Sequence, residues 1–142
     1  MDATEVGKYF YCKDENLTEI QVQKLTYYAY AWNIAINKQK LFEEQPQAWI
    51  HGPVFRSLYD SMRYKEFYNI EDYKINCDQD TKDFLDIIYK LYGKYSGNQL
   101  ENMTHIEDPW KNARLGKKPN ERSTQEISDE DIEKYYSALL SD

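Results

Sequence analysis

Cysteine, glycine and proline are scarce in this chain, which has 2 Cys, 5 Gly and 4 Pro among its 142 residues. So little glycine and proline, together with 41% hydrophobic residues, argues against a long disordered protein. Cys12 and Cys77 have no short spacing, and the two histidines add too few ligands for a metal site. We therefore expect reduced thiols, no metal ion and no cofactor, in a single domain covering residues 1–142.

Long hydrophobic runs and a surplus of positive charge are also missing. No stretch approaches the ~20 apolar residues of a membrane span. The N-terminal sequence MDATEVGKYF has neither the basic start nor the apolar run of a signal peptide. The net charge is −7, whereas nucleic-acid binding needs clustered Lys and Arg. We therefore expect a cytoplasmic protein without a membrane partner, and its charge disfavours nucleic acid and suits a basic protein partner.

The strongest positive signal is helical periodicity. Thr18 and Gln21 form a capping box, the usual start of a helix. After it, apolar side chains recur at steps of three and four, which places them on one stripe of a helix. These side chains are Val22, Leu25, Ala29, Trp32 and Ile36. Tyr28 and Ala35 widen this stripe, and a stripe this wide predicts a central helix that contacts several neighbours.

Similar caps and apolar spacings predict the other helices. One lies near the N-terminus, one begins at the Gly52–Pro53 pair, and others begin near residues 80, 96, 108 and 128. Residues 41–51 have no helical face and contain Pro46, so they predict a short extended segment. The predicted fold class is all-α, a compact single domain of six or seven helices.

Exposed aromatic residues would be the clearest mark of a protein-binding surface. Tyrosines cluster on the second helix, and because neighbours on a helix point in different directions, some of them are expected to face outward. The predicted partner-binding patch consists of Tyr27, Tyr30, Phe55 and Arg56. A basic cluster of Arg114, Lys117, Lys118 and Arg122 is interpreted as a solvated loop, with an acidic groove of a partner as the alternative ligand.

Catalytic motifs are absent from the sequence: it has no Gly-rich phosphate loop, no HExxH and no GxSxG. His51 and His105 are its only histidines, and Glu107 follows the second by two residues. A histidine near a carboxylate can transfer protons, so a small enzyme with these three residues as its acid–base site is one hypothesis. Structural histidines that cap a helix or bind a loop carbonyl are the other, and we expect no enzyme.

Four segments carry recognisable motifs in a fixed order. They are VQKLTYYAYAW (22–32), LFEEQPQAWIHGPVFRSLY (41–59), FLDIIYKLYGKYSGNQLENMTHIEDPWKNAR (84–114) and, more weakly, ISDEDIEKYYSALL (127–140). Together they resemble the Panacea domain, also called the SocA-like antitoxin domain. Thr26 and Tyr30 depart from the family, which usually has an apolar residue and Gln there. The residues that match its motifs are Lys24, Trp32, Trp49, His51, Gly52, Pro53, Tyr92, Gly93, Thr104, His105, Pro109 and Trp110.

The resemblance implies a bacterial or phage-encoded antitoxin that neutralises a cognate toxin. In this family the usual mode is direct complex formation, and a SocA-like relative instead acts as an adaptor that delivers its toxin to a protease. Neither mode requires an active site. The resemblance also makes residues 49–54 a structural turn, in which Trp49 packs, Gly52 allows close approach and Pro53 starts a helix. A phage-associated protein that binds another host or phage protein is the remaining alternative.

Overall fold

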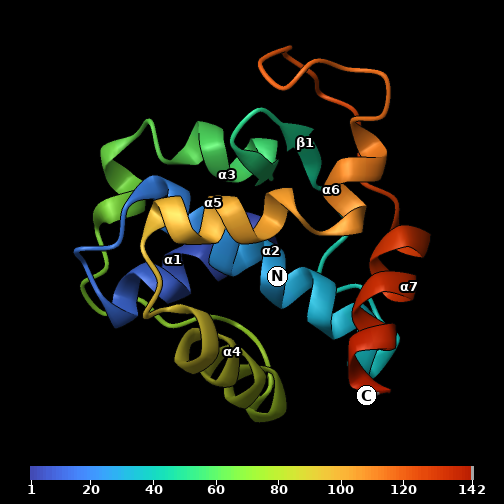
Figure 1. Cartoon of the computed structure of the whole chain (residues 1–142). Coiled ribbons are helices and arrows are strands. Elements are labelled where there is room, and N and C mark those ends of the chain that lie inside the picture. The colour runs from blue at the N-terminus through green and yellow to red at the C-terminus, as the bar shows by residue number, and fades with distance from the viewer. Residues whose placement is uncertain (142) are drawn as a thin grey trace.

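Helix α2, Glu19–Asn37, runs through the centre of the molecule, and the other elements pack around it (Figure 1). It begins at the predicted capping box, in which Thr18 and Gln21 each accept a hydrogen bond from the other's backbone amide. Thirteen of its nineteen residues are buried, so the helix is enclosed on most sides rather than along one stripe. Ile36, predicted to face inward, is 50% exposed in the last turn.

The computed structural model describes residues 1–141. Within them lie seven α-helices, one 3-10 helix and a two-stranded hairpin, so the predicted all-α domain of six or seven helices is confirmed. The segment predicted to be extended contains the first strand. In chain order the elements besides α2 are α1 (Ala3–Lys13), β1 (Gln47–Trp49), β2 (Gly52–Val54), α3 (Arg56–Ser61), η1 (Lys65–Tyr68), α4 (Gln79–Tyr92), α5 (Gly97–His105), α6 (Asp108–Ala113) and α7 (Asp129–Leu140).

Strands β1 and β2 form an antiparallel hairpin in which Trp49 is opposite Gly52. The prediction that Gly52 and Pro53 begin a helix was wrong, because both lie in β2 and α3 begins only at Arg56. Proline is compatible with this strand because its partner in the register, Ala48, directs its amide to the opposite side of β1. The missing N–H of Pro53 therefore removes no hydrogen bond between the two strands.

A segment that follows α6 extends this small sheet on the other side of β1. The Ala48 amide donates to the Gln125 carbonyl, and the Ile127 amide donates to the Pro46 carbonyl, both at 2.8 Å. The two hydrogen bonds form an antiparallel bridge, and Ile127 is fully buried beneath it. Residues that are far apart in the sequence thus form one surface around the hairpin.

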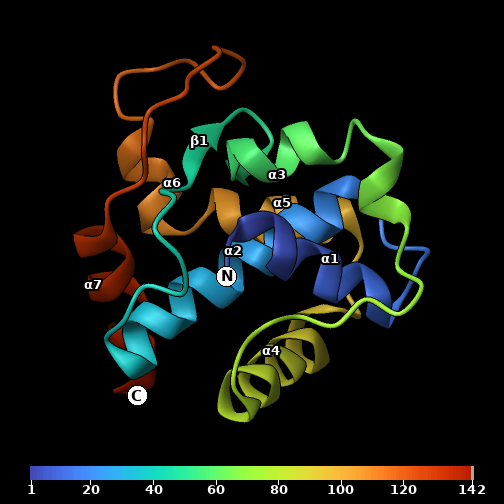
Figure 2. The same ribbon diagram turned by 180° about the vertical axis from the view of Figure 1, so that it is seen from behind.

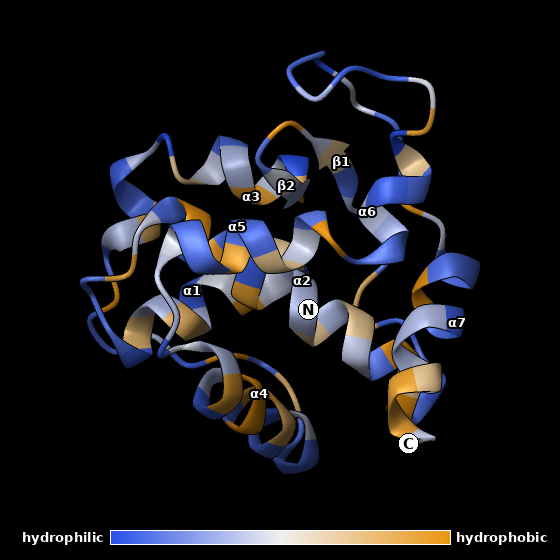
Figure 3. Cartoon of the chain, viewed as in Figure 1, coloured by the Kyte–Doolittle hydropathy of each residue, from blue (hydrophilic) through white to orange (hydrophobic). Residues whose placement is uncertain are grey.

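Helices α4 and α7 both pack against α2 (Figure 2). The hydropathy colouring of α4 alternates along the helix, because one face buries Leu85 and Ile88 while the other is in solvent (Figure 3). Asp78 caps α4, slightly before the helix start predicted near residue 80, and Ser128 caps α7, where a helix start was predicted near residue 128. None of the helices in residues 1–141 is long and apolar enough to cross a membrane.

Candidate functional site

Three of the sequence motifs meet where the hairpin rests on α2 and α5. Lys24 of α2 is 1% exposed, and its Nζ atom donates a hydrogen bond to the Pro53 carbonyl oxygen, 3.2 Å away. Gly52 has φ = 109°, and a Cβ atom there would lie 2.5 Å from Lys24 Cε and 2.9 Å from Thr104 Oγ1. The buried Thr104 hydroxyl donates to the Glu101 carbonyl at 2.9 Å. These motif residues hold the hairpin against α2 and α5. Only glycine, which has no Cβ atom, fits between Lys24 and Thr104.

The ammonium group of Lys24 has unusual surroundings for a charged group. Burial lowers the pKa of Lys24 to about 8, and the nearby negative charge of Glu101 opposes this change. The hydrogen bond to Pro53 holds the amine against β2. A substrate would reach this amine only by displacing the strand, so the position favours a structural role.

The two histidines lie near the junction of the hairpin and α5. His51, at the hairpin tip, has a 70% exposed side chain, and its Nδ1 atom is 3.2 Å from Glu101 Oε2. His105 stacks on Trp110 with ring centroids 4.0 Å apart, and burial lowers the pKa of His105. Its buried Nε2 atom has no hydrogen-bond partner among the described residues. Glu107 accepts hydrogen bonds from Tyr28 of α2 and Tyr136 of α7 and none from a histidine. Of the three residues in the acid–base hypothesis, the two histidines therefore lie near the hairpin, and the Glu107 carboxylate lies between α2 and α7.

Helix α6 holds β1 through two side chains. The Trp110 Nε1 atom donates to the Trp49 carbonyl oxygen at 2.8 Å, and the Arg114 Nη1 atom donates to the Ala48 carbonyl oxygen at 2.9 Å. Arg114 also donates to two carbonyl groups of the loop that follows α6. The interpretation of Arg114 as part of a solvated loop was therefore wrong, because its guanidinium is buried and joins that loop to the sheet.

A cluster of tyrosines surrounds Glu107 between α2 and α7. The Tyr28 and Tyr136 hydroxyls both lie 2.9 Å from Glu107 Oε1 and donate to it. The Tyr27 hydroxyl lies 3.2 Å from that of Tyr136, whose single proton is already directed to Glu107, so Tyr27 donates to Tyr136. Burial raises the pKa of Glu107 to about 7, and the two tyrosine hydrogen bonds oppose the rise.

The raised pKa of Glu107 predicts a stability that depends on pH. Between its ordinary pKa of 4.5 and about 7, the unfolded chain releases this proton before the folded chain does, so the free energy of unfolding falls as pH rises. The glutamine of the Glu107→Gln variant cannot ionise. We therefore expect the free energy of unfolding of the variant, relative to that of the unaltered chain, to increase by about 2 kcal/mol as the pH rises from 4.5 to about 7. Urea unfolding of both proteins at several pH values measures the difference. A difference that stays constant with pH would contradict the assignment.

The predicted partner-binding patch does not form a surface. Tyr27 is 1% exposed, and Tyr30 and Phe55 are fully buried, whereas Arg56 is exposed. The expectation that these aromatic residues face outward was wrong because α2 is enclosed by its neighbours, and Tyr30 packs on Phe55 and donates to Asp129 Oδ1 at 2.7 Å. Substitutions of these three aromatic residues would test the core and not a binding surface.

The remaining motif residues connect α2 with α4 and shape the start of α6. The Trp32 Nε1 atom donates to the Tyr92 hydroxyl at 2.7 Å, and the Tyr92 ring stacks on Tyr28 with centroids 4.0 Å apart. Gly93 directly follows α4, and Pro109 is buried in the first turn of α6. These residues therefore stabilise helix packing, like the motif residues around Gly52.

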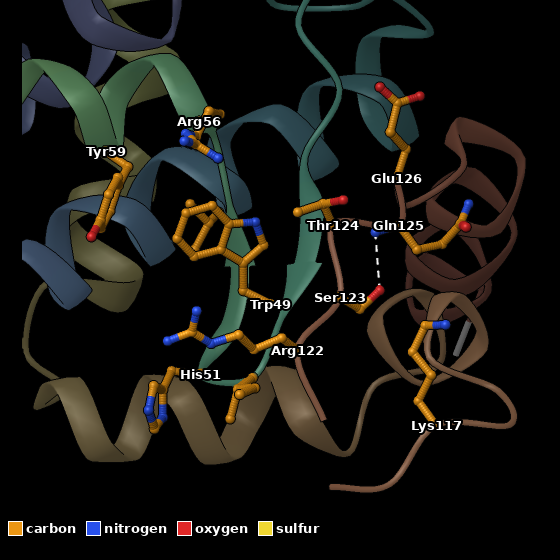
Figure 4. Close-up of a pocket in the computed structure, with 12 residues that line it drawn as sticks. Trp49, His51, Arg56, Tyr59, Lys117, Arg122, Ser123, Thr124, Gln125 and Glu126 are labelled. Carbon is orange, nitrogen blue, oxygen red and sulfur yellow. Dashed lines mark hydrogen bonds between the residues drawn. The ribbon is translucent and has the colours of Figure 1, made fainter. Parts of the chain in front are cut away.

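A surface groove of about 1050 Å³ lies beside the hairpin (Figure 4). Trp49 and Val54 reach it from the two strands, and Arg56 and Tyr59 reach it from α3. The other side is formed by residues 122–126, which include the segment that pairs with β1. The groove is therefore built on the small sheet that the motif residues hold in place.

The lining of the groove differs in charge from the rest of the chain. Arg56, Lys117 and Arg122 supply three positive charges, and Glu126 is the carboxylate among its lining residues. The whole chain carries a net charge of −7. The sequence shows the cluster of Lys117 and Arg122, but their approach to Arg56 and Trp49 depends on the pairing of the segment after α6 with β1.

The comparisons with known proteins give one match. A family model described as "Antitoxin SocA-like, Panacea domain" matches residues 22–111, a range that includes every motif residue from Lys24 to Trp110. No curated protein matches the chain, and no solved structure matches it.

Proposed function

Because the chain belongs to the SocA-like antitoxin family with a Panacea domain, we propose that it is the antitoxin of a toxin–antitoxin pair and binds its cognate toxin directly. The family match over residues 22–111 is the observation that carries this proposal. The place of action would be the cytoplasm of a bacterium, with the gene carried by the host or by a phage.

The structural role of the motif residues supports direct binding of the toxin as the mode of action. Lys24, Gly52 and Thr104 are all buried and engaged in holding the hairpin against α2 and α5. Residues of this kind maintain the shape of a surface, which suits a protein that acts by occluding another. Delivery of the toxin to a protease is the second mode in this family, and it would use the same fold.

The gene beside that of this chain provides the test. We expect its product to arrest bacterial growth when it is expressed alone, and growth to recover when this chain is expressed with it. A copy of this chain with an early stop codon is the control, because it shows that recovery requires the protein. A product that is harmless by itself, or an arrest that continues although this chain is abundant, would contradict the proposal.

A further inference from the structure

We propose that an extended acidic segment of the toxin adds as a strand to the free edge of the small sheet, along the residues 124–126 that form one wall of the groove. This inference rests on the proposed function, because it names the chemistry of the toxin segment that the chain recognises. Two observations support it: an unpaired strand edge and the positive charges of the loop beside it.

One edge of the small sheet is already covered. The Gln23 side chain forms two hydrogen bonds with the Phe55 backbone just after β2, accepting from its amide at 3.0 Å and donating to its carbonyl at 3.2 Å. Lys24 binds the carbonyl of Pro53 in β2. Helix α2 therefore satisfies the outer edge of β2, and no further strand can be added there.

The opposite edge is open. The segment after α6 uses the carbonyl of Gln125 and the amide of Ile127 to pair with β1. The amides and carbonyls of Thr124 and Glu126 alternate with these groups, so they point away from β1. Within residues 1–141 they make no hydrogen bond, and both residues are exposed. Such an edge is a template on which an extended peptide of another protein can form main-chain hydrogen bonds.

The charges beside this edge select an acidic segment. Lys117 and Arg122 are exposed and form no ion pair within the described part of the chain. Arg56 lies across the groove, with its Nε atom 3.3 Å from Asp60 Oδ1. Carboxylates on an incoming strand would be attracted by Lys117 and Arg122, whereas a basic segment would be repelled by them.

The open strand edge favours a peptide over nucleic acid as the ligand, because its unpaired amides and carbonyls can form main-chain hydrogen bonds with another strand. The net charge of −7 also disfavours binding of a phosphate backbone.

Charge reversal of the loop tests the electrostatic part of this inference. The probe is the purified product of the neighbouring gene, and calorimetry gives its Kd at low and high salt. We expect Lys117→Glu with Arg122→Glu to weaken binding at least about tenfold at low salt and to reduce its salt dependence. The control, Lys65→Glu with Lys90→Glu, makes the same change in net charge at exposed positions outside the groove, and should bind within about twofold of the unaltered chain.

The outcomes separate this inference from the proposed function. If the unaltered chain does not bind the neighbouring product, both are overturned. If the unaltered chain binds and restores growth but the groove variant binds equally well, the groove inference is wrong and the antitoxin assignment stands. Binding of a labelled single-stranded oligonucleotide that competes with the toxin and is lost in the groove variant would make nucleic acid the ligand and would also overturn the inference.

A second pair of variants tests strand addition. Glu126→Pro removes the outward-pointing amide, and proline is tolerated at a strand edge whose N–H faces solvent. Glu126→Ala keeps this amide and removes one carboxylate from the groove. We expect the proline variant to bind at least about tenfold more weakly than the alanine variant, with similar thermal unfolding of the two. Equal affinities would contradict strand addition, and if the proline variant fails to fold, the charge-reversal result decides.

Discussion

Gly52→Ala should lose about 3 kcal/mol of stability or more, enough to leave much of the protein unfolded. The backbone of Gly52 has φ = 109°, a conformation that residues with a side chain rarely adopt. The added Cβ would also lie 2.5 Å from Lys24 Cε and 2.9 Å from Thr104 Oγ1, so one of these buried side chains must move. Because Lys24 also holds β2, its displacement would release the hairpin from α2.

Gly116→Ala is the matched control, because it separates backbone strain from crowding. Gly116 has φ = 84°, but no atom lies within 4 Å of the position its Cβ would take. The substitution should therefore cost only the backbone term, about 1 kcal/mol. Urea unfolding of the two variants gives the comparison. Equal losses would show that the contacts of Gly52 with Lys24 and Thr104 have no energetic role.

Arg114→Met should have the second largest effect, a loss of about 2–4 kcal/mol. The buried guanidinium donates to the carbonyl of Ala48 in β1 and to the carbonyls of Lys118 and Glu121 in the loop after α6. Methionine fills a similar volume but leaves these acceptors without their donor. The loop would then lose its connection to the sheet, and the cationic side of the groove would lose its position.

Hydrogen exchange would show this change directly. In Arg114→Met, the amides of residues 117–127 should exchange faster than in the unaltered chain, while those of α2 change less. Arg122→Met is the matched control, because it removes an exposed arginine from the same loop and should change stability by less than about 0.5 kcal/mol. If both variants were equally stable and equally protected, Arg114 would not be the residue that attaches the loop.

The helices could be predicted from the sequence because their signals are local. The Thr18 and Gln21 capping box and the apolar spacing of α2 depend on residues three or four apart, and the capping box and the helix both appear in the structure. The burial of Tyr27 and Tyr30 could not be predicted in this way. A stripe defines the inner face of a helix with one solvent face, whereas the neighbours of α2 enclose both tyrosines.

The site depends on pairings that local patterns do not contain. The motif spacing identified Lys24, Gly52 and Thr104, but their meeting point follows from the packing of β2 between α2 and α5. The Gly52–Pro53 pair resembled a helix start, although β2 accepts Pro53 because its nitrogen faces away from β1. Gln125 and Ala48, which form a backbone hydrogen bond, are separated by more than half of the chain. The sequence before Ile127 is polar and has no alternating apolar pattern that would predict this pairing.

Direct binding of the toxin is the central claim, and one co-expression measurement tests it. The neighbouring gene product and this chain would be produced together, and the amount of toxin and its presence in a complex with this chain would be measured in the same cells. Direct neutralisation predicts that growth recovers while the toxin level is unchanged and the toxin purifies with this chain in a stable complex. Recovery of growth with loss of the toxin, prevented by removing a cellular protease, would contradict direct binding and would make the chain an adaptor for proteolysis.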